Sequence, residues 1–453
     1  MEFKKDFLWG TATASFQIEG ASKKDGRSQT VWDVFCNTPG KVFDGHTGEE
    51  ACDHYHRMEE DVAIMAKLGI PCYRFSLAWS RILPNGTGEV NQKGIDFYNR
   101  LIDCLLQHNI RPFITLFHWD LPWVLQAQGA WENSQSPYWF EEYTTVCAKA
   151  FGDRAKDFIP FNEPQCFIGL GNVSGEHAPG LRVPLESSIP MSHHVLKANG
   201  LAMNALRKYV KDVRVSYAPC QNPCIPASNS QEDIEAARKA YFDIPEKADN
   251  WAWNVTWWSD PVLLGKYPEK GLALYEQYLP KGWQEDMNVI HQKLDYYGQN
   301  IYQGRVIKAA NNAHGYEDVM LPVGYPKTAI QWPITPDCLY WGPKYLYERY
   351  HTPILITENG LSCHDVISLD GKVHDPNRED YIHRYLLAMC KAANDGVDVA
   401  GYFYWSLLDN FEWSKGYSDR FGLVYVNYQT QERIIKDSAF WYQSVIASNG
   451  KTL

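Results

Sequence analysis

Two glutamates, Glu163 and Glu358, occupy the same local setting at distant points in the chain. Glu163 lies in FIPFNEPQC (158–166) and Glu358 in PILITENGL (353–361), so each follows a short apolar run. Neither a helix nor a strand requires an acidic side chain there. Two carboxyl groups that flank one site can cleave a glycosidic bond, because one protonates the leaving oxygen while the other meets the positive charge developing at the anomeric carbon. For either glutamate alone, a salt bridge at a loop end is the alternative.

The elements that must position these glutamates recur along the whole chain. Amphipathic segments with apolar residues at spacings of three and four predict helices over 54–69, 95–106 and 378–394, the first capped by Asp53 and the last by Asn377. Between such segments lie short runs of β-branched and aromatic residues bounded by turn residues, which predict strands. The eight runs are FLWGTATASF, CYRFSLAW, RPFITLFHW, DFIPFN, VRVSYAP, LDYYGQNIY, PILITEN and VAGYFYWSL.

The alternation of these strands and helices predicts the fold class. Strands that read as continuous apolar runs belong to a parallel sheet covered by helices. Eight such units predict an α/β fold, a closed (β/α)8 TIM barrel with elaborated βα loops. No linker or low-complexity tract divides the chain, so we expect one catalytic domain over 1–453. Glu163 and Glu358 end the fourth and seventh predicted strands, and the barrel mouth should bring them together across 195 positions.

The charge of the chain bears on the class of partner. The formal net charge is −11 and no basic run is visible, which argues against binding nucleic acid or an anionic membrane. The most apolar run, VAGYFYWSLL (399–408), is about half the length that a membrane crossing needs. A neutral small molecule is therefore the expected partner.

The cysteines and histidines give little indication of a metal or cofactor. Eleven cysteines are scattered, and the N-terminal segment is too polar for a good signal peptide, so we expect reduced thiols and a cytoplasmic location. The CQNPC segment (220–224) has no partner pair at zinc-site spacing. His118 has no second histidine or cysteine at ligand spacing, so we expect no metal and no cofactor.

Longer motifs accompany both glutamates. FNEP and ITENG occur together with YRFSLAWSRI (73–82), LFHWDLP (116–122) and WSLLDNFEWSKGYSDRFGLVYV (405–426). With these motifs the chain resembles glycoside hydrolase family 1, the β-glucosidase family, from FLWGTATASFQIEG to RIIKDSAFWY. The resemblance implies a retaining, exo-acting β-glucosidase that works through a covalent glycosyl-enzyme. Its substrates would be β-glucosides and cello-oligosaccharides, with side activity on β-galactosides or β-fucosides and a part in cellulose degradation.

The same resemblance implies roles for particular residues. Glu163 would be the general acid/base and Glu358 the nucleophile. Arg74 would lie beside the nucleophile, where a fixed positive charge favours the carboxylate, and Tyr302 would orient it. Asn300 would be the hydrogen-bond partner of Glu163.

The resemblance also implies a set of residues around the sugar. A pyranose needs bidentate polar groups for its hydroxyls and aromatic walls for its faces. Gln17 and Glu412 would be bidentate partners, Asn162 would contact the 2-hydroxyl, and Trp332 would stack on the leaving-group side. The full expected set is Gln17, His118, Trp119, Asn162, Trp332, Trp405, Glu412, Trp413 and Phe421.

Specificity is less well determined by the sequence. Many family members carry tryptophan after N-E-P, whereas Gln165 stands here, which leaves aglycone preference and product inhibition open. A 6-phospho-β-glycosidase is the nearest alternative, but Glu412, Asp419 and Phe421 stand where that branch uses serine, lysine and tyrosine, and carboxylates repel a phosphate dianion. A non-catalytic glycan-binding barrel is disfavoured because both glutamates are present. The oligomeric state stays open.

Overall fold

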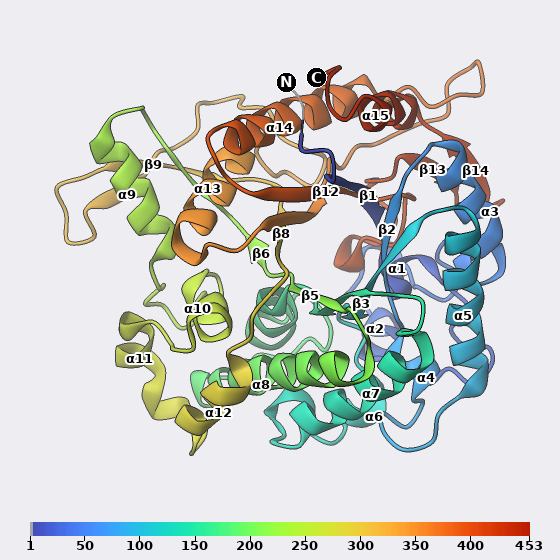
Figure 1. Cartoon of the computed structure of the whole chain (residues 1–453), viewed down its shortest axis with the longest axis horizontal. Coiled ribbons are helices and arrows are strands. Elements are labelled where there is room, and N and C mark those ends of the chain that lie inside the picture. The colour runs from blue at the N-terminus through green and yellow to red at the C-terminus, as the bar shows by residue number, and fades with distance from the viewer. Residues whose placement is uncertain (1–2) are drawn as a thin grey trace.

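A closed barrel of parallel strands forms the centre of the molecule in the computed structural model, which describes residues 3–453. The strand order is β11-β12-β1-β2-β3-β4-β5-β8, and pairing of β8 with β11 closes the barrel. Figure 1 shows these strands at the centre with the helices outside them. The strands are β1 (Leu8–Ala12), β2 (Cys72–Ser76), β3 (Arg111–Phe117), β4 (Asp157–Phe161), β5 (Arg214–Tyr217), β8 (Tyr296–Ile301), β11 (Ile354–Asn359) and β12 (Val399–Trp405). Every strand predicted from the sequence is present, and the predicted TIM barrel is confirmed.

Long amphipathic helices cover the outside of the barrel. Each turns one apolar face toward the strands, as the spacing of its apolar residues requires. The three helices predicted from the sequence are confirmed with small differences at their ends. The main helices are α3 (His54–Lys67), α5 (Gln92–Gln107), α7 (Ser136–Phe151), α8 (Leu185–Tyr209), α13 (Cys338–Tyr350), α14 (Pro376–Asn394) and α15 (Asp437–Ala447).

Both predicted helix caps are wrong. Asp53 precedes α3, but its backbone is left-handed and its carboxylate contacts His56 Nδ1 at 2.5 Å instead of a backbone amide. Asn377 lies inside α14, which begins at Pro376 with Asp375 at the capping position. Proline is well suited to a first helical position because its fixed φ is already helical and its missing N–H has no intrahelical partner there. The Asp375 carboxylate instead accepts hydrogen bonds from Ser438, at the start of α15.

The two ends of the barrel differ in chemistry. At the N-terminal end, the buried Asp157 of β4 binds Arg111 and Arg214 through four hydrogen bonds of 2.7–2.9 Å. Inside the barrel, apolar side chains such as Phe113 and Phe403 pack with ring centroids 4.8 Å apart. The opposite end, where the strands end, is left for the βα loops and the functional residues.

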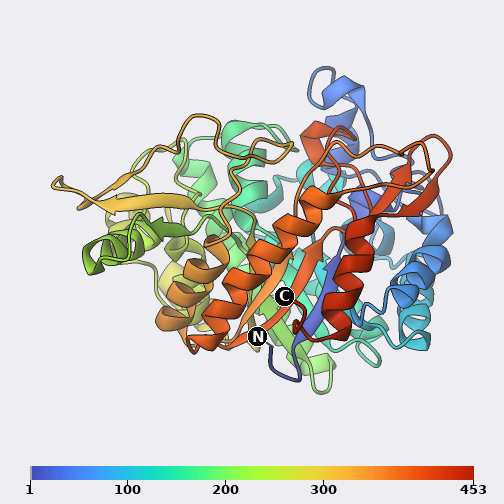
Figure 2. The same cartoon turned by 90° about the horizontal axis from the view of Figure 1, so that it is seen from above.

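Several βα loops carry further elements. The segment after β5 holds the short β6 (Cys220–Gln221), which adds to the barrel beside β8, and β7 (Cys224–Pro226), which joins β9 (Arg305–Ala309) and β10 (Tyr316–Asp318) in a small separate sheet. This small sheet and α9 (Gln231–Phe242) extend away from the barrel (Figures 1 and 2). A hairpin of β13 (Val424–Asn427) and β14 (Glu432–Ile435) follows β12.

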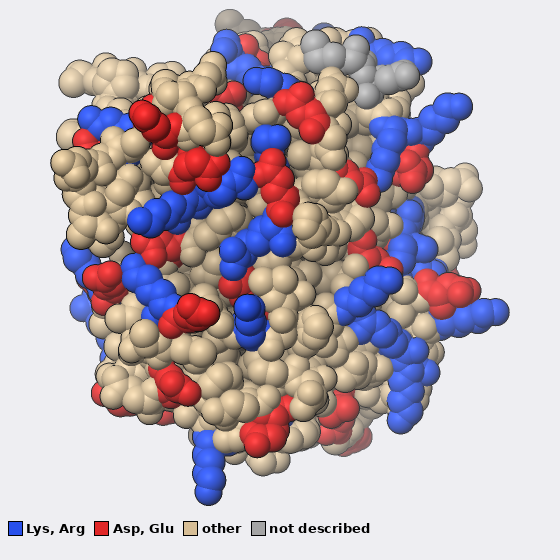
Figure 3. Space-filling model, turned by 60° about the vertical axis from the view of Figure 1, so that its left-hand side comes forward, with Lys and Arg blue, Asp and Glu red and all other residues tan. Residues whose placement is uncertain are grey.

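The outer surface carries charges of both signs. On the face drawn in Figure 3, basic and acidic side chains are intermixed. Within residues 3–453, none of the helices combines the length and the apolar character that a bilayer crossing needs.

Candidate active site

A cavity of about 790 Å³ opens at the end of the barrel where the strands terminate. Both Glu163 and Glu358 line it, together with Asn300 and Tyr302. The strands β4 and β11, which supply the two glutamates, are separated in the barrel by β5 and β8. The position of the cavity is the one at which TIM barrels bind their substrates.

Glu163 lies in a tight turn just after β4. Its φ is 45°, a left-handed conformation that costs a residue with a side chain about 1–3 kcal/mol and persists only where the surroundings impose it. Two backbone hydrogen bonds do so here: the Glu163 N–H donates to Ala218 O at 2.8 Å, and the Cys166 N–H donates to Glu163 O at 2.9 Å. The turn thereby aims the carboxyl group into the cavity.

The Glu163 carboxyl group has neutral hydrogen-bond partners. Asn300 Nδ2 donates to Oε1 at 2.8 Å, and Cys166 Sγ donates to Oε2 at 3.1 Å. Among residues 3–453, no lysine or arginine forms an ion pair with it. Burial, and next the negative charge of Glu358, raise the pKa of Glu163 to about 8. This carboxyl group therefore holds a proton at neutral pH.

Glu358 is held by charged and polar donors. Arg74 Nη1 donates to its Oε1 at 2.6 Å, and the Tyr302 hydroxyl donates to its Oε2 at 2.7 Å. Burial raises the pKa of Glu358 from its usual range, while Arg74 and Tyr302 lower it. Because the ion pair with Arg74 favours the carboxylate, the first of the two glutamates to ionise is Glu358.

Asn300 and Asn162 connect the two glutamates. In the barrel, Asn300 of β8 lies opposite Glu358 of β11, and its amide nitrogen reaches Glu163 on the other side. Asn162 Oδ1 accepts from Asn300 Nδ2 at 2.9 Å and from Arg74 Nη2 at 2.6 Å. One continuous hydrogen-bond network thus fixes Glu163 in its turn after β4 and Glu358 in β11, as a preorganised catalytic site requires.

The glycine of the ITENG motif, Gly360, is required by the packing around it. A Cβ atom on Gly360 would lie 1.8 Å from the backbone oxygen of Trp405. Only glycine therefore lets the chain leave β11 so close to the end of β12. This approach brings Trp405 and Glu358 to the same cavity.

Aromatic side chains and one acid form the inner wall of the cavity. His118 packs between Trp405 and Trp413, with ring centroids 5.8 Å and 5.9 Å apart, and Trp119 lies 4.5 Å from Trp413. Burial lowers the pKa of His118 well below its usual range, so its imidazole is neutral and can donate or accept a hydrogen bond. Burial, with Asp419 as the next cause, raises the pKa of Glu412 well above its usual range.

The outer wall contains Trp332 and Phe421 beside Tyr302. The ring centroid of Trp332 lies 5.2 Å from that of Tyr302 and 6.3 Å from that of Phe421. Gln165 also lines the cavity, and its Nε2 donates to Cys220 O at 3.1 Å. Gln165 therefore contributes a buried amide at this point of the cavity wall.

The predicted site residues fall into two layers. Those that line the cavity are His118, Trp119, Glu163, Asn300, Tyr302, Trp332, Glu358, Trp405, Glu412, Trp413 and Phe421. Arg74, Asn162 and Gln17 lie behind this wall and are at most 1% exposed. Gln17 Nε2 donates to Phe411 O at 2.8 Å, while its buried Oε1 has no partner within residues 3–453.

Two functional candidates escaped the sequence analysis, Cys166 and Cys220. Their sulfur atoms lie 3.8 Å apart and next to the carboxyl group of Glu163. Cys220 belongs to the CQNPC segment, for which the sequence offers no partner pair at zinc-site spacing. Its neighbour is 54 positions away, so no local spacing pattern could have shown the pair.

Comparison with known proteins gives consistent matches along the whole chain. The model of the family described as glycosyl hydrolase family 1 matches residues 1–451. Beta-glucosidase A of Thermotoga maritima is 45% identical over 99% of this chain and 98% of its own length. The 1,4-beta-D-glucan glucohydrolase of Thermotoga neapolitana is 45% identical over 100% of this chain and 99% of its own length. The solved structure of the Thermotoga maritima beta-glucosidase in complex with glucoimidazole superimposes with a TM-score of 0.90, covering 99% of each chain at 45% identity.

Proposed function

This chain belongs to glycosyl hydrolase family 1 and is a glycoside hydrolase, and we propose that it acts as a retaining, exo-acting β-glucosidase with Glu163 as the acid/base and Glu358 as the nucleophile. The observation that carries this assignment is the unequal environment of the two carboxyl groups in one cavity. Glu163 has neutral partners and a pKa of about 8, whereas Glu358 is paired with Arg74. Two carboxyl groups that differ in this way can serve as acid and nucleophile at the same pH.

In the first step, a Glu358 oxygen attacks the anomeric carbon while Glu163 gives its proton to the glycosidic oxygen. The leaving group departs, and a covalent glycosyl-enzyme remains. Tyr302 and Arg74 hold the nucleophile in one orientation before attack. Asn162, fixed by Arg74 and Asn300, would contact the 2-hydroxyl, a bond that strengthens in the transition state.

In the second step, the ionised Glu163 accepts a proton from water as the water oxygen attacks the anomeric carbon from the face that the leaving group vacated, and the bond to Glu358 breaks to release its carboxylate. Loss of the Glu163 proton in the first step lets it act as a base in the second. Two inversions at the same carbon retain the β configuration.

The substrate class follows from the cavity wall. Neutral His118 and the surrounding tryptophans suit a terminal, uncharged sugar, with β-glucosides and cello-oligosaccharides as substrates and β-galactosides or β-fucosides as side substrates. The negative charge of Asp419 already raises the pKa of Glu412, and a sugar phosphate would add further negative charge. Paired assays of plain and 6-phosphorylated aryl β-glucosides should show turnover of the plain substrate.

We further propose that the whole chain works as one catalytic unit in the cytoplasm and takes part in cellulose degradation. All eleven cysteines are free thiols, which suits a reducing compartment. The Thermotoga neapolitana relative named as a 1,4-beta-D-glucan glucohydrolase supports a cello-oligosaccharide substrate.

The assignment of the two glutamates can be tested by azide rescue. We expect Glu358→Gly to abolish hydrolysis of an activated aryl β-glucoside and added azide to restore turnover with an α-glycosyl azide as product. In Glu163→Ala, azide should instead attack the glycosyl-enzyme and give the β-glycosyl azide. The reverse pattern would show that the two roles are exchanged, and release of the α-anomer by the unmodified enzyme would exclude retention.

A further inference from the structure

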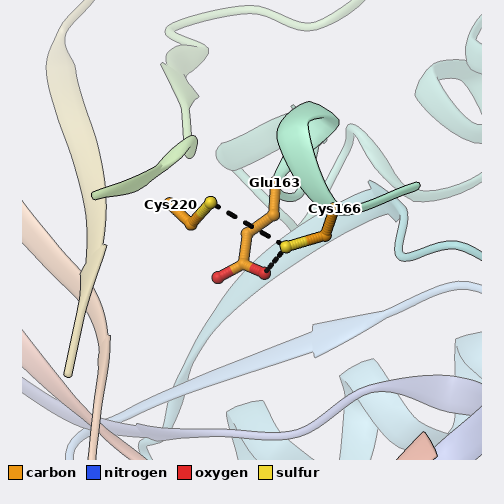
Figure 4. Close-up of side chains that lie close together, drawn as sticks. All are labelled: Glu163, Cys166 and Cys220. Carbon is orange, nitrogen blue, oxygen red and sulfur yellow. Dashed lines mark hydrogen bonds between the residues drawn. The ribbon is translucent and has the colours of Figure 1, made fainter. Parts of the chain in front are cut away.

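We propose that Glu163, Cys166 and Cys220 form a binding site for a thiophilic divalent cation of the zinc type, and that the bound ion switches off hydrolysis. Glu163 and Cys166 come from one turn and Cys220 from a separate segment, and the three side chains lie close together, as Figure 4 shows. The inhibitory part of this proposal rests on the proposed role of Glu163 as the acid/base, whereas the site itself rests on geometry alone.

Two of the three distances between the ligand atoms are close to those around a tetrahedral ion. The two sulfur atoms are 3.8 Å apart, and all three ligand atoms lie within 4.8 Å of one another. Two thiolates bound to zinc at about 2.3 Å and at the tetrahedral angle are about 3.8 Å apart. A thiolate and a carboxylate oxygen on the same ion are about 3.5 Å apart, so the Cys166 sulfur, now 3.1 Å from Glu163 Oε2, needs to move only a few tenths of an ångström.

Rigid backbone holds the three ligands. Cys166 begins the helical segment η3 (Cys166–Ser174), and its N–H donates to Glu163 O, so one tight turn presents both side chains. Cys220 lies in β6, opposite Asn300 of β8, and Asn300 itself binds Glu163. Because these segments are already ordered, metal binding would cost little conformational entropy.

The other cysteine of the CQNPC segment takes no part. Cys224 is in β7, on the separate small sheet, and its sulfur accepts a hydrogen bond from Arg305 Nη2 at 3.4 Å. The spacing within the segment is thus irrelevant to the site. The pairing of Cys220 with Cys166 is created by the fold.

The cavity gives an ion access to the site. Glu163, Cys166 and Cys220 all line it, so a water molecule can supply a fourth ligand from the cavity side, as in zinc sites with three protein ligands. On binding, the two thiols and the Glu163 carboxyl group each release a proton to solvent, and the two thiolates with the carboxylate carry three negative charges against the two positive charges of the ion.

Metal binding and proton donation exclude each other at Glu163. A carboxylate oxygen that coordinates an ion carries no proton for the leaving oxygen of the substrate, and the ion occupies space beside the reacting bond. Hydrolysis should therefore fall in proportion to the fraction of sites occupied and recover when a chelator removes the ion.

The site can be tested by binding measurements that do not depend on activity. With the full chain kept reduced by a phosphine, equilibrium dialysis against Zn²⁺ should give about one ion per chain, and Co²⁺ should produce a thiolate-to-metal charge-transfer band. Cys166→Ala and Cys220→Ala should each weaken binding by about tenfold or more and remove or diminish the band. Cys104→Ala, on the outer helix α5, is the matched control and should bind like the unmodified chain.

Circular dichroism and thermal melting would show whether each variant is folded, and the two single variants test the site independently. Absence of tight binding, or binding and a charge-transfer band that persist in folded Cys166→Ala and Cys220→Ala, would overturn the site.

Rate measurements then test, separately from metal binding, whether the bound ion inhibits hydrolysis. Each variant's hydrolysis is compared with its own rate without metal, and we expect inhibition to follow occupancy in the unmodified chain and in Cys104→Ala only. If Co²⁺ produces the thiolate band while the rate stays unchanged, the inhibitory effect is wrong and the site stands. If the metal-free chain hydrolyses no β-glucoside, the proposed function fails, and the binding measurements still decide the site.

Discussion

The exchange Glu163→Gln tests the division of labour between the two glutamates most directly. Glutamine keeps the shape of the side chain and an oxygen that can accept the hydrogen bond from Asn300 Nδ2, now 2.8 Å long. What it removes is the transferable proton. Any loss of rate therefore reports proton transfer more than a change of structure.

The size of the effect follows from the pKa of Glu163. With an ordinary carboxyl pKa of 4.5, about 0.3% of molecules would hold the proton at pH 7, whereas with a pKa of about 8 roughly 90% hold it. Burial beside Glu358 thus enriches the acid form about 300-fold. The acid form is present below pH 8 and is lost as the pH rises through about 8, so the basic limb of the rate profile of the unmodified enzyme should lie there.

The assay is kcat/KM for cellobiose and for an activated aryl β-glucoside from about pH 5 to about pH 10. For cellobiose, whose leaving group needs a proton, Glu163→Gln should lower kcat/KM by about 10²–10⁴-fold and abolish the basic limb. The aryl substrate should lose much less kcat/KM, because its leaving group departs without protonation. Glu89→Gln, an exposed glutamate, is the matched control. A basic limb near pH 8 that survives in folded Glu163→Gln would refute the assignment.

Three further exchanges probe the support of the site. Arg74→Met should lower kcat/KM and move the acidic limb of the rate profile to higher pH, because Arg74 lowers the pKa of Glu358. Loss of this buried ion-pair partner should also lower the free energy of unfolding, measured in urea, by about 3–5 kcal/mol. Gly360→Ala should reduce both kcat and Tm, since its Cβ would meet Trp405 O at 1.8 Å, and a variant with unchanged kcat and Tm would contradict this packing argument. Asp157→Asn should lower the free energy of unfolding, because it leaves Arg111 and Arg214 without their charged partner. The loss should be about 2–4 kcal/mol, less than for a fully buried pair, since both arginines are about one-third exposed. The kcat measured well below Tm should stay unchanged, because Asp157 lies at the barrel end opposite the active site.

The barrel itself was predictable from local sequence. Each barrel strand is a short apolar run that can be buried on both faces, and amphipathic segments that predict helices follow three of these runs. The two-residue β6 and the small sheet of β7, β9 and β10 were not predicted, because strands this short show no distinct pattern of apolar residues in the sequence. The caps at Asp53 and Asn377 were predicted wrongly, since the structure instead pairs Asp53 with His56 and begins α14 at Pro376.

The candidate site likewise combines features set by the local sequence with features set by the tertiary structure. The sequence by itself determined which side chains are present: two glutamates at strand ends, an arginine, a tyrosine and the aromatic residues of long motifs. Only the tertiary structure decided that Glu163 has neutral neighbours while Glu358 has Arg74, that Gln17 lies behind the cavity wall, and that Cys166 meets Cys220. The physical reason is that chemical identity is local, whereas burial, charge contacts and ligand geometry depend on which distant segments the closed barrel brings within a few ångströms of one another.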